Sequence, residues 1–207
     1  SSAPCGTCEN CSSPPHGRGR PDLCETTLGY WGSITMGFGQ LLLTPYQLVV
    51  PIPDNMPFDI ASLCEPLGVC IDLVQAAQVE YGDHVLVIGP GPLGLGAIAL
   101  AKRAGAAHIY TAGRSTSKGR MDAALALGTD TFIEIDKKPL TDYKFGARKP
   151  DKILVTAQPD SLPAAIQVAA KGAIISYIGV GMNHTKQVSF DADDFHFRKL
   201  SLRPSHA

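Results

Sequence analysis

The sequence has no long uninterrupted apolar run and almost no net charge. Its 18 lysine and arginine residues nearly balance 19 aspartate and glutamate residues, which leaves a formal charge of −1. A membrane-spanning helix needs roughly 20 consecutive apolar residues, and nucleic-acid-binding domains carry an excess of positive charge. Neither a membrane nor a nucleic acid is therefore an expected partner. The first residues also lack the charged-then-apolar pattern of a signal peptide, so we expect a cytoplasmic protein.

The apolar run 85–88 breaks into glycines and then continues as an alanine-rich helical pattern over 97–104. Gly89 permits a sharp turn off the strand, Gly91 leaves room for a pyrophosphate, and Gly94 lets the helix pack close to the strand. Phosphates bind at the positive end of such a helix. The alternative is a strand, turn and helix with no ligand. The candidate dinucleotide-binding residues of this turn are Gly89, Gly91, Pro92, Leu93 and Gly94.

The second strand, His108–Ala112, is not followed by the acidic residue that bonds an adenosine ribose in many dinucleotide-binding units. Gly113 leaves room there, and Arg114 can bind a 2′-phosphate in a bidentate manner. Positively charged side chains that follow in the same turn strengthen the attraction for this phosphate. The sequence therefore predicts NADP(H) in preference to NAD(H). A solvated basic loop is the alternative. The candidate residues are Gly113, Arg114, Ser115, Lys118 and Arg120.

Four of the six cysteines lie in the first 24 residues. Two-residue gaps between Cys5, Cys8 and Cys11 allow their sulfurs to surround one ion, and Cys24 completes a tetrahedral shell. A closed shell of four thiolates is typical of structural zinc, and thiolates in an enzyme-like cytoplasmic chain bind metal more often than they form disulfides. A disulfide pair in a secreted protein is the alternative.

Beyond the second strand, short apolar strands continue to alternate with amphipathic helices. This alternation predicts an α/β fold with a doubly wound parallel sheet, which binds ligands at the carboxyl edge of its strands. Ala157 is then expected near the ribose beside the nicotinamide, and Gly179 and Val180 near the nicotinamide itself. The expected helices are 66–78, 118–127 and 162–170, and the expected strands are 131–135, 153–156, 173–178 and 200–203.

Together these features resemble the zinc-containing medium-chain dehydrogenases, in particular the polyol and threonine dehydrogenase branch. The resemblance rests on residues 4–11, 38–54 and 65–67, the glycine turn and the run 195–203, which follow one another in the family's order. It implies a remnant of a GroES-like β domain in residues 1–64, with a zinc lobe at 5–24 and strands at 40–43 and 47–50. A Rossmann dinucleotide-binding domain is implied for residues 65–207. Family members usually separate the third and fourth cysteines by fewer residues than the twelve between Cys11 and Cys24.

The resemblance also gives Glu65 a role. In polyol-type relatives this position ligates or closely approaches a catalytic zinc, where a carboxylate can hold an exchangeable place while the metal polarises an alcohol or carbonyl oxygen. From the residues alone, Glu65 is a helix-entry residue at the positive end of the helix dipole, and the neighbouring Cys64 is a rival ligand. Cys64 and Cys70 are otherwise expected as small core side chains.

The resemblance further implies an internal piece of a longer enzyme, because family members begin with a segment that supplies a catalytic cysteine and a Gly-His-Glu motif, and they continue beyond the last strand. The implied activity is zinc-dependent hydride transfer between an alcohol or polyol and a nicotinamide cofactor, in a homodimer or homotetramer. One alternative is a zinc-stabilised nucleotide-binding protein without catalysis, such as a redox sensor. Another is a zinc-independent reductase of the same fold.

Overall fold

The computed structural model describes residues 2–14, 17–25, 28–29, 39–42, 49–146, 148–180 and 186–205. The chain divides into two compact units, Ser1–Glu65 and Pro66–Ala207. Each unit is described by itself.

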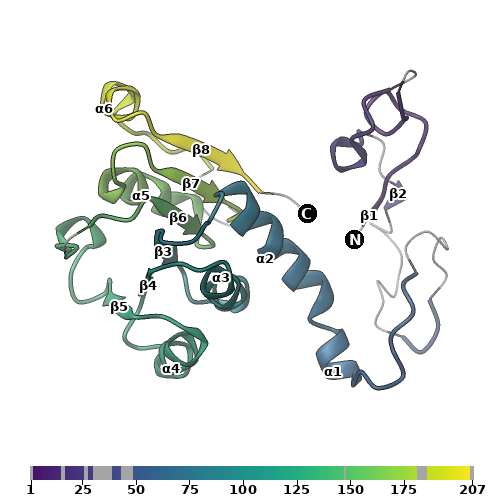
Figure 1. Ribbon diagram of the computed structural model, residues 1–207, viewed down its shortest axis with the longest axis horizontal. Helices are drawn as coiled ribbons and strands as arrows, with labels where there is room; N and C mark the ends of the chain where they lie inside the picture. Colours follow the sequence, from purple (N-terminus) through teal and green to yellow (C-terminus); the bar gives the residue numbers. More distant parts are fainter. Residues whose placement is uncertain are drawn as a thin grey trace. The chain divides into compact units, whose positions relative to one another are not determined.

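A six-stranded sheet forms the centre of the second unit (Figure 1). Its strands are β3 His84–Ile88, β4 His108–Gly113, β5 Thr131–Glu134, β6 Lys152–Val155, β7 Ile174–Tyr177 and β8 Ser201–Pro204. Their order is β5-β4-β3-β6-β7-β8, and every neighbouring pair is parallel. The chain builds outward from β3 in one direction and then returns to build outward from β6 in the other. Doubly wound sheets bind ligands at this point of reversal, and the predicted fold class is confirmed.

The helices agree with the sequence predictions apart from their ends and from α6, which was not predicted. They are α2 Cys64–Ala76, α3 Pro92–Arg103, α4 Lys118–Leu127, α5 Leu162–Val168 and α6 Ala192–Phe197. α3 begins five residues before the expected pattern, because proline at the first helical position already has the helical φ and needs no N–H acceptor. The helix expected over 66–78 stops at Ala76, and the left-handed φ of 54° at Gln78 prevents its continuation. None of the helices in the described ranges is long and apolar enough to cross a membrane.

The sequence analysis missed α6, although its start carries a recognisable signal. Asp191 precedes the helix, and its side chain accepts a hydrogen bond of 2.9 Å from the backbone N–H of Asp194. An aspartate at this position satisfies one of the unpaired N–H groups at a helix start.

The apolar residues of the sheet divide into two cores because successive side chains of a strand point to opposite faces. Val85 and Val87 belong to the core that includes residues of α2, α3 and α4, whereas Leu86 and Ile88 belong to the core that includes residues of α5. Val85, Leu86 and Val87 have no exposed surface. A strand covered on both faces reads as a continuous apolar run, as observed at 85–88.

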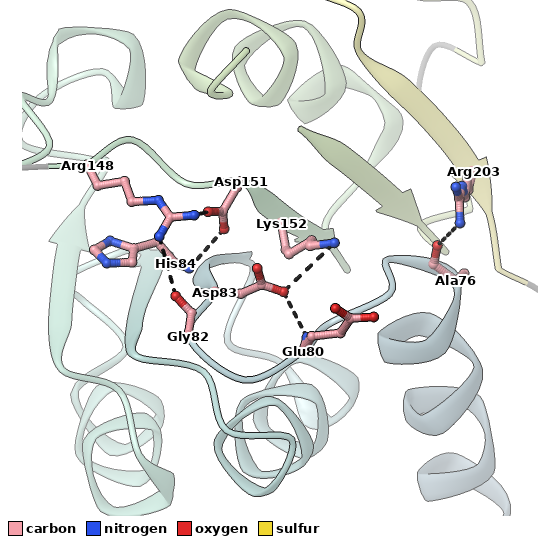
Figure 2. A network of polar contacts seen from close by, with 9 residues as sticks. All are labelled: Ala76, Glu80, Gly82, Asp83, His84, Arg148, Asp151, Lys152 and Arg203. Atoms are coloured by element: carbon pink, nitrogen blue, oxygen red, sulfur yellow. Dashed lines mark hydrogen bonds and ion pairs between the residues drawn. The ribbon is translucent and has the colours of Figure 1, made fainter. Parts of the chain in front are cut away.

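A network of polar contacts lies at the amino ends of β3 and β6 (Figure 2). Asp151 Oδ1 accepts the backbone N–H of His84 at 2.8 Å, and the other carboxylate oxygen pairs with Arg148. Asp83 Oδ2 lies 3.8 Å from Lys152 Nζ. Backbone groups of Ala76, Glu80 and Gly82 also take part, through Arg203, Asp83 and Arg148 respectively. The network therefore ties the two central strands together at the edge opposite their carboxyl ends.

The first unit contains little regular structure in its described part. β1 Ser2–Ala3 pairs antiparallel with β2 Leu28–Gly29, and α1 spans Phe58–Ala61. The strand predicted at 40–43 is wrong for residues 40–42, because an extended segment becomes a strand only when a neighbour pairs with its backbone groups. Leu41 is 91% exposed. Of the strand predicted at 47–50, residues 49 and 50 are not in a strand, and residues 43–48 lie outside the described residues.

Candidate functional site

A cavity of about 660 Å³ lies at the carboxyl edge of the sheet, where β3, β4 and β6 end. Its position is the point of reversal at which a ligand is expected. The lining residues of β3 and its turn are Ile88, Gly89, Pro90 and Gly91. Those at the end of β4 and after it include Gly113, Arg114, Ser117 and Arg120, and those that follow β6 include Thr156, Ala157, Gln158 and Asp160.

The glycine turn has the geometry that the sequence predicts for close packing. Gly89 has a φ of +99°, which L side chains rarely adopt. A Cβ added at Gly94 would lie 1.9 Å from the carbonyl oxygen of Gly89, so only glycine fits where the helix crosses the strand end. A Cβ at Gly91 would meet nothing within 4 Å. The space beside Gly91 is therefore open, as a bound phosphate requires.

The start of α3 offers unpaired donors to this open space. Gly91 has an extended conformation, and no described side chain caps the helix there. Pro92 lacks an N–H, and the first helical bond runs from the N–H of Leu95 to the carbonyl of Gly91 at 2.8 Å. The N–H groups of Leu93 and Gly94 precede that bond and therefore have no acceptor within the helix. Backbone donors at a helix start, facing open space, fit the pyrophosphate of a dinucleotide.

Two arginines place positive charge at the same cavity. Arg114 and Arg120 both line it, and neither has an ion-pair partner within the described ranges. Lys118, which the sequence also proposed, is exposed and does not line the cavity. The free guanidinium groups can bind an anion such as a 2′-phosphate.

The structure brings a carboxylate to this loop that the sequence analysis did not foresee. Asp136 follows β5, and its two oxygens accept hydrogen bonds from Ser115, at 2.8 Å from the backbone N–H and 2.7 Å from Oγ. These donated hydrogen bonds lower the pKa of Asp136. The argument from the sequence considered only the residues that follow β4 and missed the acidic residue after the neighbouring strand.

The remaining predicted cofactor residues lie at the ends of β6 and β7. Ala157 lines the cavity, whereas Gly179 and Val180 do not. Gly179 packs against Ala157 so closely that a Cβ would lie 1.7 Å from the Ala157 carbonyl oxygen, and Val180 is exposed. The sequence analysis also missed Gln158, whose buried Oε1 has no hydrogen-bond partner within the described residues. Its position three residues after the end of β6 was the available signal.

The first unit gathers the four predicted cysteine ligands in one place. The Sγ atoms of Cys5, Cys8, Cys11 and Cys24 all lie within 4.8 Å of one another. The loop that separates Cys11 from Cys24 folds back onto the preceding turn, with backbone bonds from Arg18 to Glu9 at 2.8 Å and from Arg20 to Asn10 at 2.6 Å. The long gap in the sequence is thus taken up by a compact loop.

The chemistry of this cysteine cluster fits a zinc ion. Zinc holds four thiolates at about 2.3 Å in a tetrahedron, which requires sulfurs roughly 3.8 Å apart. The Thr7 N–H and hydroxyl lower the pKa of Cys5 to about 6, whereas desolvation and the adjacent Cys24 thiol raise the pKa of Cys11 to about 12. Four thiols this close together cannot all lose their protons, because the thiolates would repel one another. A divalent cation bound among them offsets that repulsion.

Glu65 is exposed in the first turn of α2, and the exposed Cys64 precedes it. The prediction that both Cys64 and Cys70 are core side chains is wrong for Cys64, because it is the first residue of the helix and projects from the packed surface. Cys70 is buried, and its thiol donates a hydrogen bond of 3.2 Å to the Leu93 carbonyl. The first-turn position of Glu65 fits the helix-entry interpretation of the sequence.

A family model described as zinc-binding dehydrogenase matches residues 92–207. The L-threonine 3-dehydrogenase of Rhizobium etli is 34% identical over 138 residues, which cover 67% of this chain and 38% of that relative. The chain thus spans well under half the length of this curated relative.

Two solved structures have the same fold over 99% of this chain. One, from Sinorhizobium meliloti 1021 and bound to NADP, has a TM-score of 0.86 with 23% identity and is covered over 59% of its length. The other is a short chain alcohol dehydrogenase from Escherichia coli CFT073 complexed with NADH, with a TM-score of 0.85, 24% identity and the same 59% coverage. At these identities the likeness establishes the fold.

Proposed function

The chain belongs to the zinc-binding dehydrogenase family, and on this premise we propose that it serves in hydride transfer between NADP(H) and an alcohol or polyol or the corresponding ketone or aldehyde. One observation carries the choice of cofactor. Arg114 and Arg120 line the cavity at the ends of the central strands, and neither guanidinium group has an ion-pair partner among the described residues, so both can bind an anion. We therefore propose NADP(H) rather than NAD(H).

In this proposal each part of the cavity binds a different part of the cofactor. The N–H groups of Leu93 and Gly94 hold the pyrophosphate at the start of α3, and Arg114 and Arg120 hold the 2′-phosphate. Ala157 flanks the path toward the nicotinamide, and Gly179 packs against Ala157 from outside the cavity. The nicotinamide supplies or accepts the hydride, while the protein contributes orientation and charge.

Zinc has two proposed places. Cys5, Cys8, Cys11 and Cys24 would hold a structural ion, since four thiolates leave no open position for a substrate. Glu65 would approach a catalytic ion that polarises the substrate oxygen. The remaining ligands of that ion are not assigned to residues of this chain.

The substrate class and the assembly are proposals of the same kind. The relative from Rhizobium etli is named for L-threonine, whose hydroxyl group makes it an alcohol. That name supports a small alcohol as the substrate, and the proposal extends this class to polyols. We further propose a cytoplasmic homodimer or homotetramer, to be tested by light scattering of the purified protein.

Calorimetric titration of NADPH and NADH tests the choice of cofactor. We expect tighter binding of NADPH by the unmodified protein, and Arg114→Ala should weaken NADPH binding about tenfold or more while changing NADH binding little. Arg103→Ala is the matched control, because Arg103 is an exposed arginine in the last turn of α3, at the opposite end from the cavity. Equal affinities for the two cofactors, or a preference for NADH, would refute the proposal.

Activity is tested separately with a panel of polyols, secondary alcohols and amino alcohols. Formation of NADPH from NADP⁺ is followed by its absorbance. Reduction of NADP⁺ by at least one of these alcohols is expected. Dinucleotide binding without turnover of any of them would contradict the proposed catalysis and favour a nucleotide-binding protein.

A further inference from the structure

We propose that Asp136 is a specificity-determining residue of the cofactor site, because its carboxylate occupies the donors of Ser115 and thereby weakens binding of a dinucleotide that carries a 2′-phosphate. The inference rests on the proposed function, since it requires a dinucleotide in the cavity. It adds a residue that limits the preference for NADP(H) over NAD(H).

The position of Asp136 is fixed by the sheet. β4 and β5 are parallel neighbours, with Gly113 opposite Glu134, and the N–H of Ile135 donates to the Gly113 carbonyl at 3.0 Å. Ile135 itself lines the cavity. The next residue, Asp136, is thus held against the loop that follows β4 by the regular hydrogen bonding of the sheet.

Both oxygens of the Asp136 carboxylate accept hydrogen bonds from the same residue. Ser115 donates its backbone N–H to Oδ1 at 2.8 Å and its Oγ–H to Oδ2 at 2.7 Å. Ser115 directly follows Arg114, whose guanidinium is free at the cavity. An N–H and a hydroxyl beside a free arginine are the donor set that phosphate oxygens accept. The Asp136 carboxylate therefore holds the donors that a phosphate would otherwise take.

A 2′-phosphate can bind here in two ways, and Asp136 opposes both. If the phosphate takes the Ser115 donors, the two hydrogen bonds to Asp136 must first break. If Asp136 stays in place, two anions lie close together, and like charges repel. The 2′-hydroxyl of NAD(H) is uncharged and meets neither cost. Asp136 therefore acts selectively on the phosphorylated cofactor.

Nearby positive charge offsets this effect only in part. The closest lysine in sequence, Lys137, is already paired with Glu134 at 2.7 Å. Arg114 and Arg120 remain as the attractive charges, and Asp136 adds to the opposing charge of Asp160, which lines the cavity itself. The preference for NADPH over NADH thus depends on opposing charges near the 2′-phosphate, and a substitution of Asp136 removes one of them.

Asp136→Asn removes that charge with little change of shape. The asparagine carbonyl can still accept the Ser115 N–H, and its amide can donate to the Ser115 hydroxyl. Calorimetric titration should show NADPH binding about tenfold more tightly than in the unmodified protein, with NADH affected less than about twofold. The same contrast is expected between 2′,5′-ADP and 5′-AMP, which differ only in the phosphate concerned.

Three further variants make the test specific. Asp136→Ser, which is uncharged but shorter, should show the same selective gain, and Asp136→Glu, which keeps the charge, should not. Asp122→Asn removes one exposed carboxylate from α4, the helix that carries Arg120, and should leave the ratio of the two affinities unchanged. A gain with Asp122→Asn would show a general effect of net charge and overturn the inference.

The failures of the two proposals can be told apart. If the unmodified protein binds NADPH and NADH but both uncharged variants leave their ratio unchanged, the inference about Asp136 is wrong and the dinucleotide site stands. If the unmodified protein binds neither dinucleotide nor the adenosine phosphates, the proposed function fails and the inference falls with it.

Discussion

The backbone N–H of His84, the first residue of β3, donates a 2.8 Å hydrogen bond to the side chain of Asp151, the residue before β6. These strands are neighbours at the point where the sheet reverses its direction of growth. The bond therefore joins their amino ends, and the cavity lies beyond their carboxyl ends. Arg148 holds the second oxygen of Asp151 (Figure 2).

Asp151→Ala should destabilise the second unit by about 1–3 kcal/mol, because it leaves the His84 N–H without its acceptor. Asp151→Asn keeps an acceptor for that N–H and loses only the ion pair with the half-exposed Arg148, so it should cost under about 1 kcal/mol. Urea unfolding followed by circular dichroism measures both. Equal losses for the two variants would show that the backbone bond contributes little.

Two glycines of the cofactor turn should respond differently to alanine. Gly94→Ala places a Cβ 1.9 Å from the Gly89 carbonyl oxygen, so we expect a loss of at least about 1–3 kcal/mol of stability. Gly91→Ala meets no atom within 4 Å and should change stability by under about 0.5 kcal/mol. The added methyl group should nevertheless weaken NADPH binding, because it fills the space proposed for the pyrophosphate. Thermal unfolding and calorimetric titration give the two readings, and unchanged NADPH affinity in Gly91→Ala would contradict the proposed phosphate position.

The cysteine cluster should hold one zinc ion, and Cys24→Ser should remove one equivalent, because serine is a poor ligand for a metal held by thiolates. Cys70→Ser is the matched control. Cys70 is buried in the second unit, and a serine there can still donate to the Leu93 carbonyl. Mass spectrometry of the metal content decides the matter. Full zinc in Cys24→Ser, or loss of zinc in Cys70→Ser, would exclude the four-cysteine site.

The contact between Ser115 and Asp136 should make a small part of the stability depend on pH. The hydrogen bonds from Ser115 lower the pKa of Asp136 below its ordinary value of 3.8, and Lys137 acts in the same direction. A carboxyl group with a lowered folded pKa stabilises the fold above the ordinary value, and this contribution is lost as the pH falls through the lowered value.

Urea midpoints of the unmodified protein and of Asp136→Asn test this dependence. The difference between the two should be largest at neutral pH and should shrink in acid, since Asp136 becomes neutral like the asparagine. If the difference between the two urea midpoints does not change with pH, the charge of Asp136 does not contribute to the stability of the fold.

The sheet and most helices could be predicted because each depends on local signals. The range of α4 was predicted as observed, and the glycine turn at 89–94 has the predicted close packing. The strand predicted at 40–43 failed over residues 40–42, since pairing depends on a partner that periodicity does not identify. Cys64 was misjudged because apolar neighbours in sequence do not decide which side of a helix is covered.

The hydrogen bonds between Ser115 and Asp136 could not be predicted from the sequence, because they too depend on which strands lie side by side. The two residues are 21 positions apart, and their contact depends on β5 lying beside β4. A search for an acidic residue along β4 alone cannot find a carboxylate that arrives from the next strand. Cys24, by contrast, was found by residue type, and the structure shows how its longer loop returns to the other cysteines.

The crowding at Gly113 bears on how such a cofactor preference changes during evolution or design. A Cβ at this position would lie 2.7 Å from both the Phe132 ring and the Pro90 ring. An aspartate that binds the ribose of NAD(H) cannot be introduced there unless one of those rings moves. Reversing the preference through residue 113 therefore requires a second substitution that makes room at Phe132 or Pro90. A variant substituted at residue 113 alone would be strained and would gain no new selectivity.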